Sequence, residues 1–317
     1  MSPAKREHLP EIALTDLKSA IRENLENALN ELGLSQDLSV IRTESSVADG
    51  VAVFAVGRGN KRAILLLSPT KFPDVISQEL TKAAAMRNHL GELLGSVIML
   101  PLAQGCLLNR SYALMPFQRP FNNNRIFFAL QKHQIKSQVI EWVQNVNERH
   151  NTIPASTDDR EQFVLPLQHL YAMPAADPCI RDAASTALNR PQKGRFRPRF
   201  VPMHRDLWKG NILRKIRDHG DTTTAHRFVI IDWRGSRIKG FPIFDLVRVS
   251  SSFELAPDQF NAEVIRATKI LECDPVDARS YVTTALGEIA INLDQFPLDR
   301  FLQLARDCLS ELRKANI

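Results

Sequence analysis

The sequence predicts an α+β protein with two lobes, a small antiparallel β-sheet followed by a larger, mostly helical part. Two observations lead to this fold class. Short apolar segments bounded by turn residues, the pattern of β-strands, gather before Phe117, whereas apolar residues recur at helical spacing through most of the chain beyond it. The 317 residues, of which 44% are hydrophobic and 24% charged, are enough for two packed lobes.

The N-terminal part begins with a predicted amphipathic helix, for which Thr15 or Asp16 supplies a cap and Gly33 an end. Arg58–Lys61 is typical of a hairpin turn between two strands. Asp74 is placed to cap a second helix. The predicted strands and this helix are, in chain order, strands 38–43, 51–57 and 62–67, helix 75–94, and strands 96–103 and 111–117.

We therefore expect three segments: an N-terminal helical segment (1–37), a lobe with the sheet and one helix on the nucleotide side (38–117), and a helical lobe with the catalytic loop and acceptor site (118–317). Two strand-like runs, 199–204 and 227–233, interrupt the helical lobe. Its predicted helices are 135–148, 259–271, 276–293 and 298–314.

The composition excludes fewer classes of protein than the spacing of apolar residues does. A net charge of +6 and a pI near 9.2 favour anionic partners, among them nucleotides, nucleic acids and membrane surfaces. No apolar run is long enough for a signal peptide or a membrane span. The scattered cysteines fit no zinc site or disulfide framework, so we expect a protein of the cytoplasm. These cysteines are Cys106, Cys179, Cys273 and Cys308.

Three side chains, two between the strand-like runs and one near the end of the second run, indicate phosphoryl transfer. This chemistry needs a carboxylate to accept the proton of the attacking hydroxyl and oxygen ligands for magnesium. Asp206 and Asn211 form an Asp-x4-Asn loop that supplies a base and an amide ligand. Asp232 follows the apolar run 228–231 and supplies a second, anionic ligand for magnesium.

The segments that carry these residues, His204–Leu213, Ile231–Trp233 and Phe244–Leu246, resemble the aminoglycoside phosphotransferase and choline kinase family. In that family of small-molecule kinases the loop usually reads His-Gly-Asp-x4-Asn, and Ile-Asp-Trp or Ile-Asp-Phe replaces the Asp-Phe-Gly of protein kinases. The resemblance implies a protein-kinase-like bilobal fold and the use of ATP and Mg. At the second position of this loop the sequence has Arg205 instead of glycine, as protein kinases do.

By the same resemblance each motif residue takes a role. Asp206 would be the catalytic base, Asn211 and Asp232 would bind the nucleotide through magnesium, and His204 and Asp245 would brace the catalytic loop. Glu79, in the helix after the third strand, is placed as the partner of a lysine that binds the α- and β-phosphates.

That lysine is missing from the third strand, where Leu66–Ser68 occupy the expected position. Lys61 and Lys71 are alternatives, although a solvated surface lysine explains each of them better. The turn 43–50 also lacks a glycine-rich phosphate loop. Its Ser45 and Ser46 can cover phosphates or simply form a turn.

The acceptor is less defined. The basic run Arg190–Arg199 can dock an anion, or it is a solvated loop, which single-sign runs usually form. It has too few aromatic residues to stack nucleic acid, which we do not expect as a partner. If the run borders the cleft, it argues against a polycationic acceptor such as an aminoglycoside and for a sugar, a phosphorylated metabolite or a protein hydroxyl. The acidic stretch Phe253–Asp258 argues in the opposite direction. Trp208 and Trp233 either line the acceptor pocket or pack in the lobe.

Three functional hypotheses follow from these residues. The first is a phosphotransferase that moves the γ-phosphate of ATP, with magnesium, to a hydroxyl of a small molecule. The second, based on the missing strand lysine, is a catalytically weak or inactive kinase-fold protein that binds a partner. The third, based on Arg205, is a protein kinase.

Overall fold

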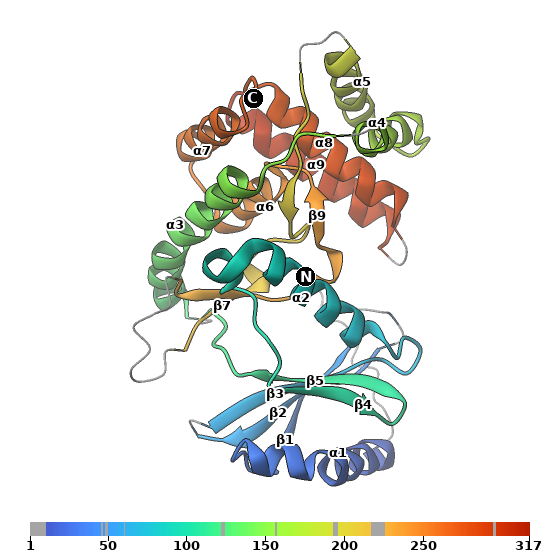
Figure 1. The fold of residues 1–317 in the computed structure, drawn as a ribbon, viewed down its shortest axis with the longest axis vertical. Coiled ribbons are helices and arrows are strands. Elements are labelled where there is room, and N and C mark those ends of the chain that lie inside the picture. The colour runs from blue at the N-terminus through green and yellow to red at the C-terminus, as the bar shows by residue number, and fades with distance from the viewer. Residues whose placement is uncertain are drawn as a thin grey trace. The chain divides into compact units, whose positions relative to one another are not determined.

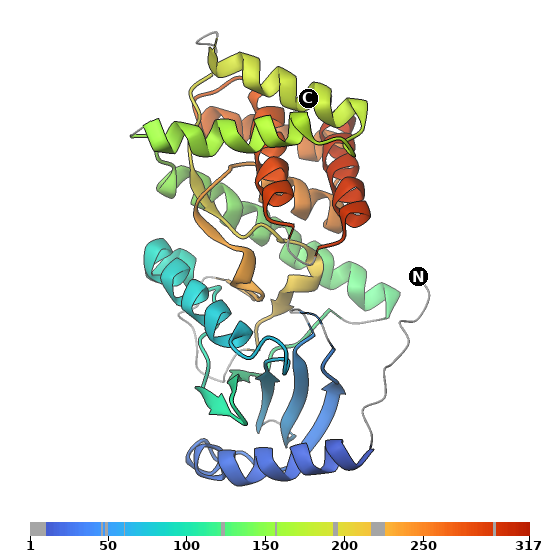
Figure 2. The same ribbon diagram turned by 90° about the vertical axis from the view of Figure 1, so that its right-hand side faces the viewer.

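A computed structural model describes residues 11–317 except 46, 48–49, 60, 122–123, 156, 193–195, 217–225 and 294–295. The chain divides into two compact units, drawn together in Figures 1 and 2. The first unit comprises the chain up to Ala84 together with Met99–Gln118, and the second comprises Ala85–Ile98 with Arg119–Ile317.

The first unit is built on a five-stranded antiparallel sheet with the strand order β1-β2-β3-β5-β4. The expected turn joins β2 and β3, where Arg58 pairs with Lys61 and Gly59 has a φ of 60°; Asn60 lies outside the described residues. The sheet consists of β1 (Leu38–Arg42), β2 (Ala52–Arg58), β3 (Lys61–Leu67), β4 (Ala103–Leu107) and β5 (Arg110–Pro116).

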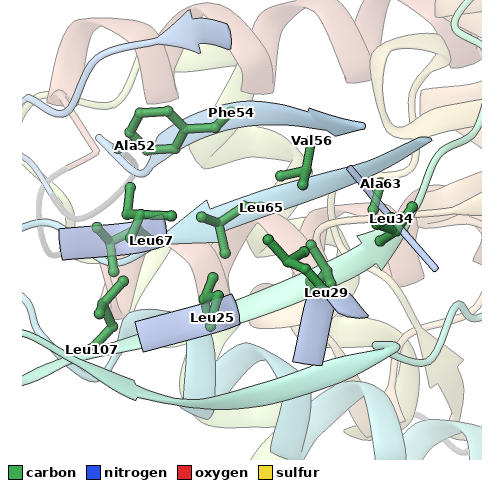
Figure 3. Packing of buried hydrophobic residues seen from close by; sticks show 12 residues of the cluster. Leu25, Leu29, Leu34, Ala52, Phe54, Val56, Ala63, Leu65, Leu67 and Leu107 are labelled. Carbon is green, nitrogen blue, oxygen red and sulfur yellow. The ribbon is translucent and has the colours of Figure 1, made fainter. Parts of the chain in front are cut away.

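Helix α1 (Glu11–Glu31) covers one face of this sheet (Figure 1). Its leucines pack against alternate residues of the strands, because successive side chains of a strand point to opposite faces. Figure 3 shows this core, which includes Leu25 and Leu29 of α1 and Leu65 of β3. The predicted cap at Thr15 or Asp16 is wrong, since the helix begins at Glu11.

Helix α2 (Val75–Gly95) packs its N-terminal residues on the opposite face of the sheet. Val75 and Ile76 are buried there against residues of β3 and β5, among them Leu66 and Met115. The chain passes from the first unit to the second within this helix, and Gly91, with a φ of 71°, interrupts its helical backbone.

The prediction of a strand over 96–103 is wrong. Val97 and Ile98 are fully buried in the second unit, where the Val97 carbonyl accepts a hydrogen bond from the Ile230 amide at 2.8 Å. Pro101 has no N–H to donate to a strand neighbour. The edge strand β4 begins only at Ala103, and its apolar spacing is weak because the residues of this edge strand are mostly exposed.

The second unit is mainly helical (Figure 2). The predicted helix over 135–148 is longer, and α4, α5 and α6 have no individual prediction. Two small antiparallel pairs, β6 with β9 and β7 with β8, accompany the helices. The helices are α3 (Arg125–His150), α4 (Thr157–Ala172), α5 (Pro178–Gln192), α6 (Phe244–Phe253), α7 (Pro257–Ile270), α8 (Asp277–Ile291) and α9 (Leu298–Lys314). The strands are β6 (Val201–Met203), β7 (Ile212–Arg214), β8 (Phe228–Ile230) and β9 (Arg237–Gly240).

The basic run Arg190–Arg199 is tied down at both ends. Arg190, near the end of α5, forms ion pairs with Asp274 and Asp277. The Arg199 guanidinium pairs with Glu272. These two arginines are therefore not solvated loop residues, and their charges are balanced by carboxylates of the same unit.

No helix in the described part of the chain combines the length and the apolar character needed to cross a membrane.

Candidate functional site

The predicted catalytic residues lie on one segment of the second unit, between β6 and β7. Asp206 comes three residues after the end of β6, and Asn211 ends a short 3-10 helix that leads directly into β7. Because β6 pairs with β9 and β7 pairs with β8, both ends of the segment are fixed by strand hydrogen bonds. The segment 204–211 is called the catalytic segment below.

His204 joins the catalytic segment to the chain that leads to Asp232. Its Nδ1 accepts a hydrogen bond from the Asp206 amide at 3.3 Å, so Nε2 carries the proton and donates to the Ile231 carbonyl at 2.9 Å. The ring lies edge-on to Trp233, with 4.6 Å between ring centroids. Burial lowers the pKa of His204, which is consistent with a neutral imidazole.

Asp245 clamps the backbone of the catalytic segment. Its carboxylate accepts the amide hydrogens of His204, at 2.6 Å, and of Arg205, at 3.0 Å. Asp245 lies in the first turn of α6, where the helix dipole favours a negative charge. Burial raises the pKa of this carboxyl, while His204 and the two amides act in the opposite direction. The clamp holds Arg205 at a φ of 78°, a conformation that glycine adopts without strain.

Asp206 and Asn211 are in direct contact. The Asn211 amide nitrogen donates to the Asp206 backbone oxygen at 2.9 Å and to its Oδ2 at 3.1 Å. This leaves the Asn211 side-chain oxygen for another partner. Gly210 lies under the indole of Trp208, where a Cβ would approach the ring to 2.4 Å. The glycine thus lets the segment turn tightly between Asp206 and Asn211.

Asp232 follows β8 on a backbone in the left-handed region, with a φ of 66°. Its neighbours are fixed on both sides. The Ile231 amide donates to the Asn211 carbonyl at 3.0 Å, and the buried Trp233 indole donates to the Ile230 carbonyl at 2.9 Å. Asp232 itself is exposed. Trp233 therefore packs in the unit, whereas Trp208 remains 39% exposed.

Arg248 is a site residue that the motifs alone do not reveal. Its Nη2 donates to Asp206 Oδ1 at 2.9 Å. Arg248 lies three residues after Asp245 on α6, and residues with this spacing share a helix face. The sequence signal is thus Asp245-x-x-Arg248, which becomes readable once Asp245 is placed in a helix against the catalytic segment.

In the first unit, the expected lysine position at the end of β3 is filled by side chains that stabilise the fold. Ser68 is fully buried, and its hydroxyl accepts the Ile76 amide hydrogen at 3.0 Å. The Ser111 hydroxyl lies 2.7 Å from that of Ser68 and accepts the Ser77 amide hydrogen at 3.2 Å. These two serines cap α2. The predicted cap by the Asp74 side chain is wrong, since that side chain makes no hydrogen bond within the described residues.

A cation does lie near the end of β3, but its donors are already used. The Arg110 guanidinium donates to the Ser68 carbonyl at 2.6 Å and pairs with Glu44 at 2.6 Å. It also donates to Thr70 Oγ1 at 3.2 Å. Only about a tenth of this side chain is exposed. Arg110 therefore acts as an internal brace and leaves no arm for a phosphate.

The two substitute lysines differ in position. Lys61 opens β3 at the hairpin, and six residues of strand separate it from Leu67, a distance of about 20 Å. Lys71 is exposed and follows β3 by four residues. Of the two, only Lys71 lies at the end of the strand where the phosphate-binding lysine is expected.

The other residues predicted for the nucleotide side are also in the first unit. Glu79 is partly buried on α2. Ser45 stands in the turn between β1 and β2, where its amide donates to the Gly50 carbonyl at 2.9 Å. A Cβ on Gly50 would come within 2.2 Å of Ser45 Oγ, so the turn requires glycine there. Ser46 lies outside the described residues.

This architecture is the protein-kinase-like fold that the motif resemblance predicted, and two solved structures share it. The choline kinase of Streptococcus pneumoniae is 12% identical and matches with a TM-score of 0.52 over 94% of this chain and 99% of its own. A choline/ethanolamine kinase family protein of Mesorhizobium loti is 13% identical and matches with a TM-score of 0.50 over 95% and 94% of the two chains. Comparison with protein-family models and with curated protein sequences gives no match.

Proposed function

We propose that this protein is a phosphotransferase that moves the γ-phosphate of ATP, with Mg²⁺, to a hydroxyl of a small molecule. The observation that carries the proposal is the pair formed by Asp206 and Asn211, joined at 3.1 Å within a segment that is fixed at both ends. His204 and Asp245 fix the backbone of this segment and are themselves buried. Such support is what a reactive carboxylate needs to keep its orientation.

In the proposed reaction, Asp206 accepts the proton of the acceptor hydroxyl as its oxygen attacks the γ-phosphorus. Half of the Asp206 side chain is exposed, so a substrate hydroxyl has access to it. The proton transfer adds nucleophilic character to the hydroxyl in the transition state. Trp208, an exposed residue of the catalytic segment, is the aromatic residue we assign to the acceptor side.

The chemistry of the donor set fits magnesium. Asn211 offers its side-chain oxygen, since its nitrogen is bound to Asp206, and Asp232 offers an exposed carboxylate. Mg²⁺ is typically held by one or two such oxygen ligands together with substrate phosphates and water. When bound, the ion neutralises phosphate charge. Glu79 and Lys71 of the first unit are the residues we assign to the nucleotide side.

A second candidate function is supported by a specific observation. Ser68 and Arg110 use the end of β3 for internal hydrogen bonds, so the charge that usually holds the α- and β-phosphates is absent from that end of the strand. A kinase-fold protein that binds a partner without turnover would tolerate this loss. We rank it second because such a protein has no physical need for the braced Asp206, Asn211 and Asp232.

The melting temperature in the presence of ATP separates the two functions. A ligand that binds the native state stabilises it by mass action. For the phosphotransferase we expect a stabilisation by millimolar ATP that requires Mg²⁺ and is lost in Asp232→Ala, followed by ATP consumption with an acceptor. No shift with ATP and Mg²⁺, and no consumption with any acceptor, would favour the binding protein.

A further inference from the structure

Arg248 places a positive charge beside the proposed base. Its Nη2 donates to Asp206 Oδ1 at 2.9 Å, and 22% of the Arg248 side chain is exposed. A guanidinium has five N–H donors in a planar fork. Within the described part of the chain the bond to Asp206 is the only hydrogen bond that Arg248 makes, and its Nε is buried without a partner. The fork therefore has donors left for a second anion.

The acid that suggested a cationic acceptor is already paired. Glu254, at the C-terminal end of α6, forms an ion pair with Lys132 at 2.6 Å. Lys132, and to a smaller extent Lys209, lower the pKa of this exposed carboxyl. The negative charge of the stretch Phe253–Asp258 is thus partly balanced by α3 and by the catalytic segment itself.

The catalytic segment also contacts the end of α6 through its backbone. The Lys209 amide donates to Ser252 Oγ at 3.1 Å, so Asp206, Lys209, Arg248 and Glu254 belong to one continuous surface of the segment and the helix. Glu254 and Lys132 cancel each other there. Arg248 pairs with Asp206 on this surface and keeps guanidinium donors beyond that one bond.

We propose that the acceptor carries an anionic group, a phosphate or a carboxylate, close to the hydroxyl that is phosphorylated, and that Arg248 binds this group. The inference rests on the proposed function and names the substrate class of that site. One arm of the guanidinium stays on Asp206 while the other takes the anion, the two-armed geometry for which arginine is suited. An amino alcohol such as choline would be repelled by the same charge.

This arrangement also orients the acceptor. The hydroxyl oxygen forms a bond to the γ-phosphorus while the bond between that phosphorus and the bridging oxygen of ADP breaks, and the hydroxyl proton passes to Asp206. Arg248 holds the anionic group of the acceptor on one side of Asp206 and so limits which hydroxyl reaches the carboxylate. Arg248 thus determines specificity, whereas Asp206 takes part in the chemistry.

The first test measures binding without turnover. The full chain is heated without nucleotide in the presence of sugar phosphates and sugar acids, each matched with its neutral parent sugar and its amino sugar, and with choline. We expect at least one anionic compound to stabilise the wild type more than its matched neutral and cationic forms. In Arg248→Gln its affinity should fall about 10- to 100-fold, the effect of losing a hydrogen bond to a charged group. If sugar phosphates stabilise the protein, the anionic group is a phosphate, and if sugar acids do so, it is a carboxylate.

Two further variants keep the test decisive. Arg248→Lys retains the charge but not the fork and should recover part of the binding. Arg266→Gln removes an arginine of α7 that pairs with Glu141 at 2.7 Å on the surface of the same unit, and it should leave the binding unchanged. Melting of each variant without ligand checks that it folds. Equal stabilisation of the wild type and Arg248→Gln, or no stabilisation by any anionic compound, overturns the inference.

ATP consumption then separates the inference from the proposed function. If anionic acceptors are consumed and Arg248→Gln raises their KM far more than it lowers kcat, both are supported. If neutral sugars or choline are phosphorylated faster than every anionic acceptor, the inference fails while the phosphotransferase stands. If anions bind through Arg248 but no acceptor consumes ATP, the anion site stands and the phosphotransferase fails.

Discussion

The end of β3 in the first unit and the catalytic segment in the second both contain buried polar side chains, but they use them differently. At the end of β3, Ser68 and Arg110 satisfy neighbouring backbone groups, and both residues are buried. In the catalytic segment, the buried His204 and Asp245 support Asp206, half of whose side chain is exposed. Buried polar groups satisfy one another in the first region, whereas in the second they support an exposed carboxylate, which we propose is the reactive group.

Buried polar groups contribute differently in the two units. A polar group taken out of water must find partners, whatever else it does. At the end of β3 all the partners are internal, so this part of the first unit contributes stability rather than charge for a nucleotide. The second unit provides the carboxylates, the amide and Arg248. Substitutions should therefore affect stability in the first region and turnover in the second.

The largest effect should come from Asp206→Asn. The variant keeps the size of the side chain but cannot accept a proton, so kcat should fall about 10²- to 10⁴-fold. Steady-state ATP consumption with an accepted substrate measures this. The melting shift produced by ATP and Mg²⁺ should stay close to that of the wild type. A kcat within a few-fold of the wild type would show that Asp206 is not the base.

The matching change in the first unit is Ser68→Ala, which should affect stability instead. It removes the acceptor for the Ile76 amide and the hydroxyl partner of Ser111, in a fully buried position. An unsatisfied buried donor costs about 1–3 kcal/mol in the free energy of unfolding. Urea unfolding monitored by circular dichroism measures the change.

The control for this prediction is Ser35→Ala. The Ser35 hydroxyl bonds to Asp37 at 2.8 Å on the surface of the same unit, so its loss should change stability by less than about 0.5 kcal/mol. If Ser68→Ala were equally mild while nucleotide binding weakened, Ser68 would belong to the nucleotide site and the comparison between the two regions would collapse.

Acid should destabilise the second unit more than the first. The described residues of the first unit contain no histidine, whereas burial lowers the pKa of His150, His204 and His226 in the second. Below pH about 6.5 these histidines bind protons in the unfolded chain but stay neutral in the folded chain. Each of them therefore lowers the free energy of unfolding by up to about 1.4 kcal/mol per pH unit. Stability is therefore full above pH 6.5 and declines below it. The raised pKa of Asp245 acts in the opposite direction and reduces the slope.

Tryptophan fluorescence reports this effect selectively, since Trp142, Trp208 and Trp233 all lie in the second unit. Urea unfolding followed by fluorescence should show a lower midpoint at pH 5.5 than at pH 7.5. His226→Gln should flatten the dependence, and substitution of the exposed His169 by Gln should not. A midpoint that is independent of pH would mean that His204 is not held neutral by burial.

The sequence predicts the parts of the fold that have strong periodicity or exact motifs. The strands β2, β3 and β5 and the helices α7, α8 and α9 follow from apolar spacing, and the residue order of the catalytic segment follows from its motif. The strand over 96–103 fails because its apolar residues pack in the second unit, a destination that spacing does not encode. The spacing of apolar residues shows which face of a strand or helix is buried, but it does not show which element covers that face.

The supporting contacts are the part that the sequence does not reveal. A serine at position 68 looks like the loss of a lysine, and only the fold shows that its hydroxyl caps α2. The partner of Asp206 is 42 residues away, so no local pattern joins Arg248 to it. Charge runs mislead for the same reason, because the carboxylates that balance Arg190 are more than 80 residues further on, at Asp274 and at Asp277, the first residue of α8.

The smallest expected effect is on stability and concerns the backbone conformation at Arg205. In the first unit Gly33, Gly57 and Gly59 have a positive φ, and so do Leu108 and Asn109 in the turn between β4 and β5. The catalytic segment holds Arg205 at a φ of 78°. Arg205→Gly and Arg205→Ala both remove the contacts of the arginine side chain. Alanine keeps a Cβ, which is strained at a positive φ, whereas glycine adopts this φ without strain.

We therefore expect Arg205→Gly to unfold at a higher urea concentration than Arg205→Ala, with a difference of about 1 kcal/mol in the free energy of unfolding. The difference between the two variants is the informative quantity, since the contacts of the arginine are lost in both. Equal stability would show that Asp245 does not impose the left-handed conformation in solution. A more stable glycine variant with kcat close to that of Arg205→Ala would show that the clamp, rather than the identity of residue 205, sets the geometry around Asp206.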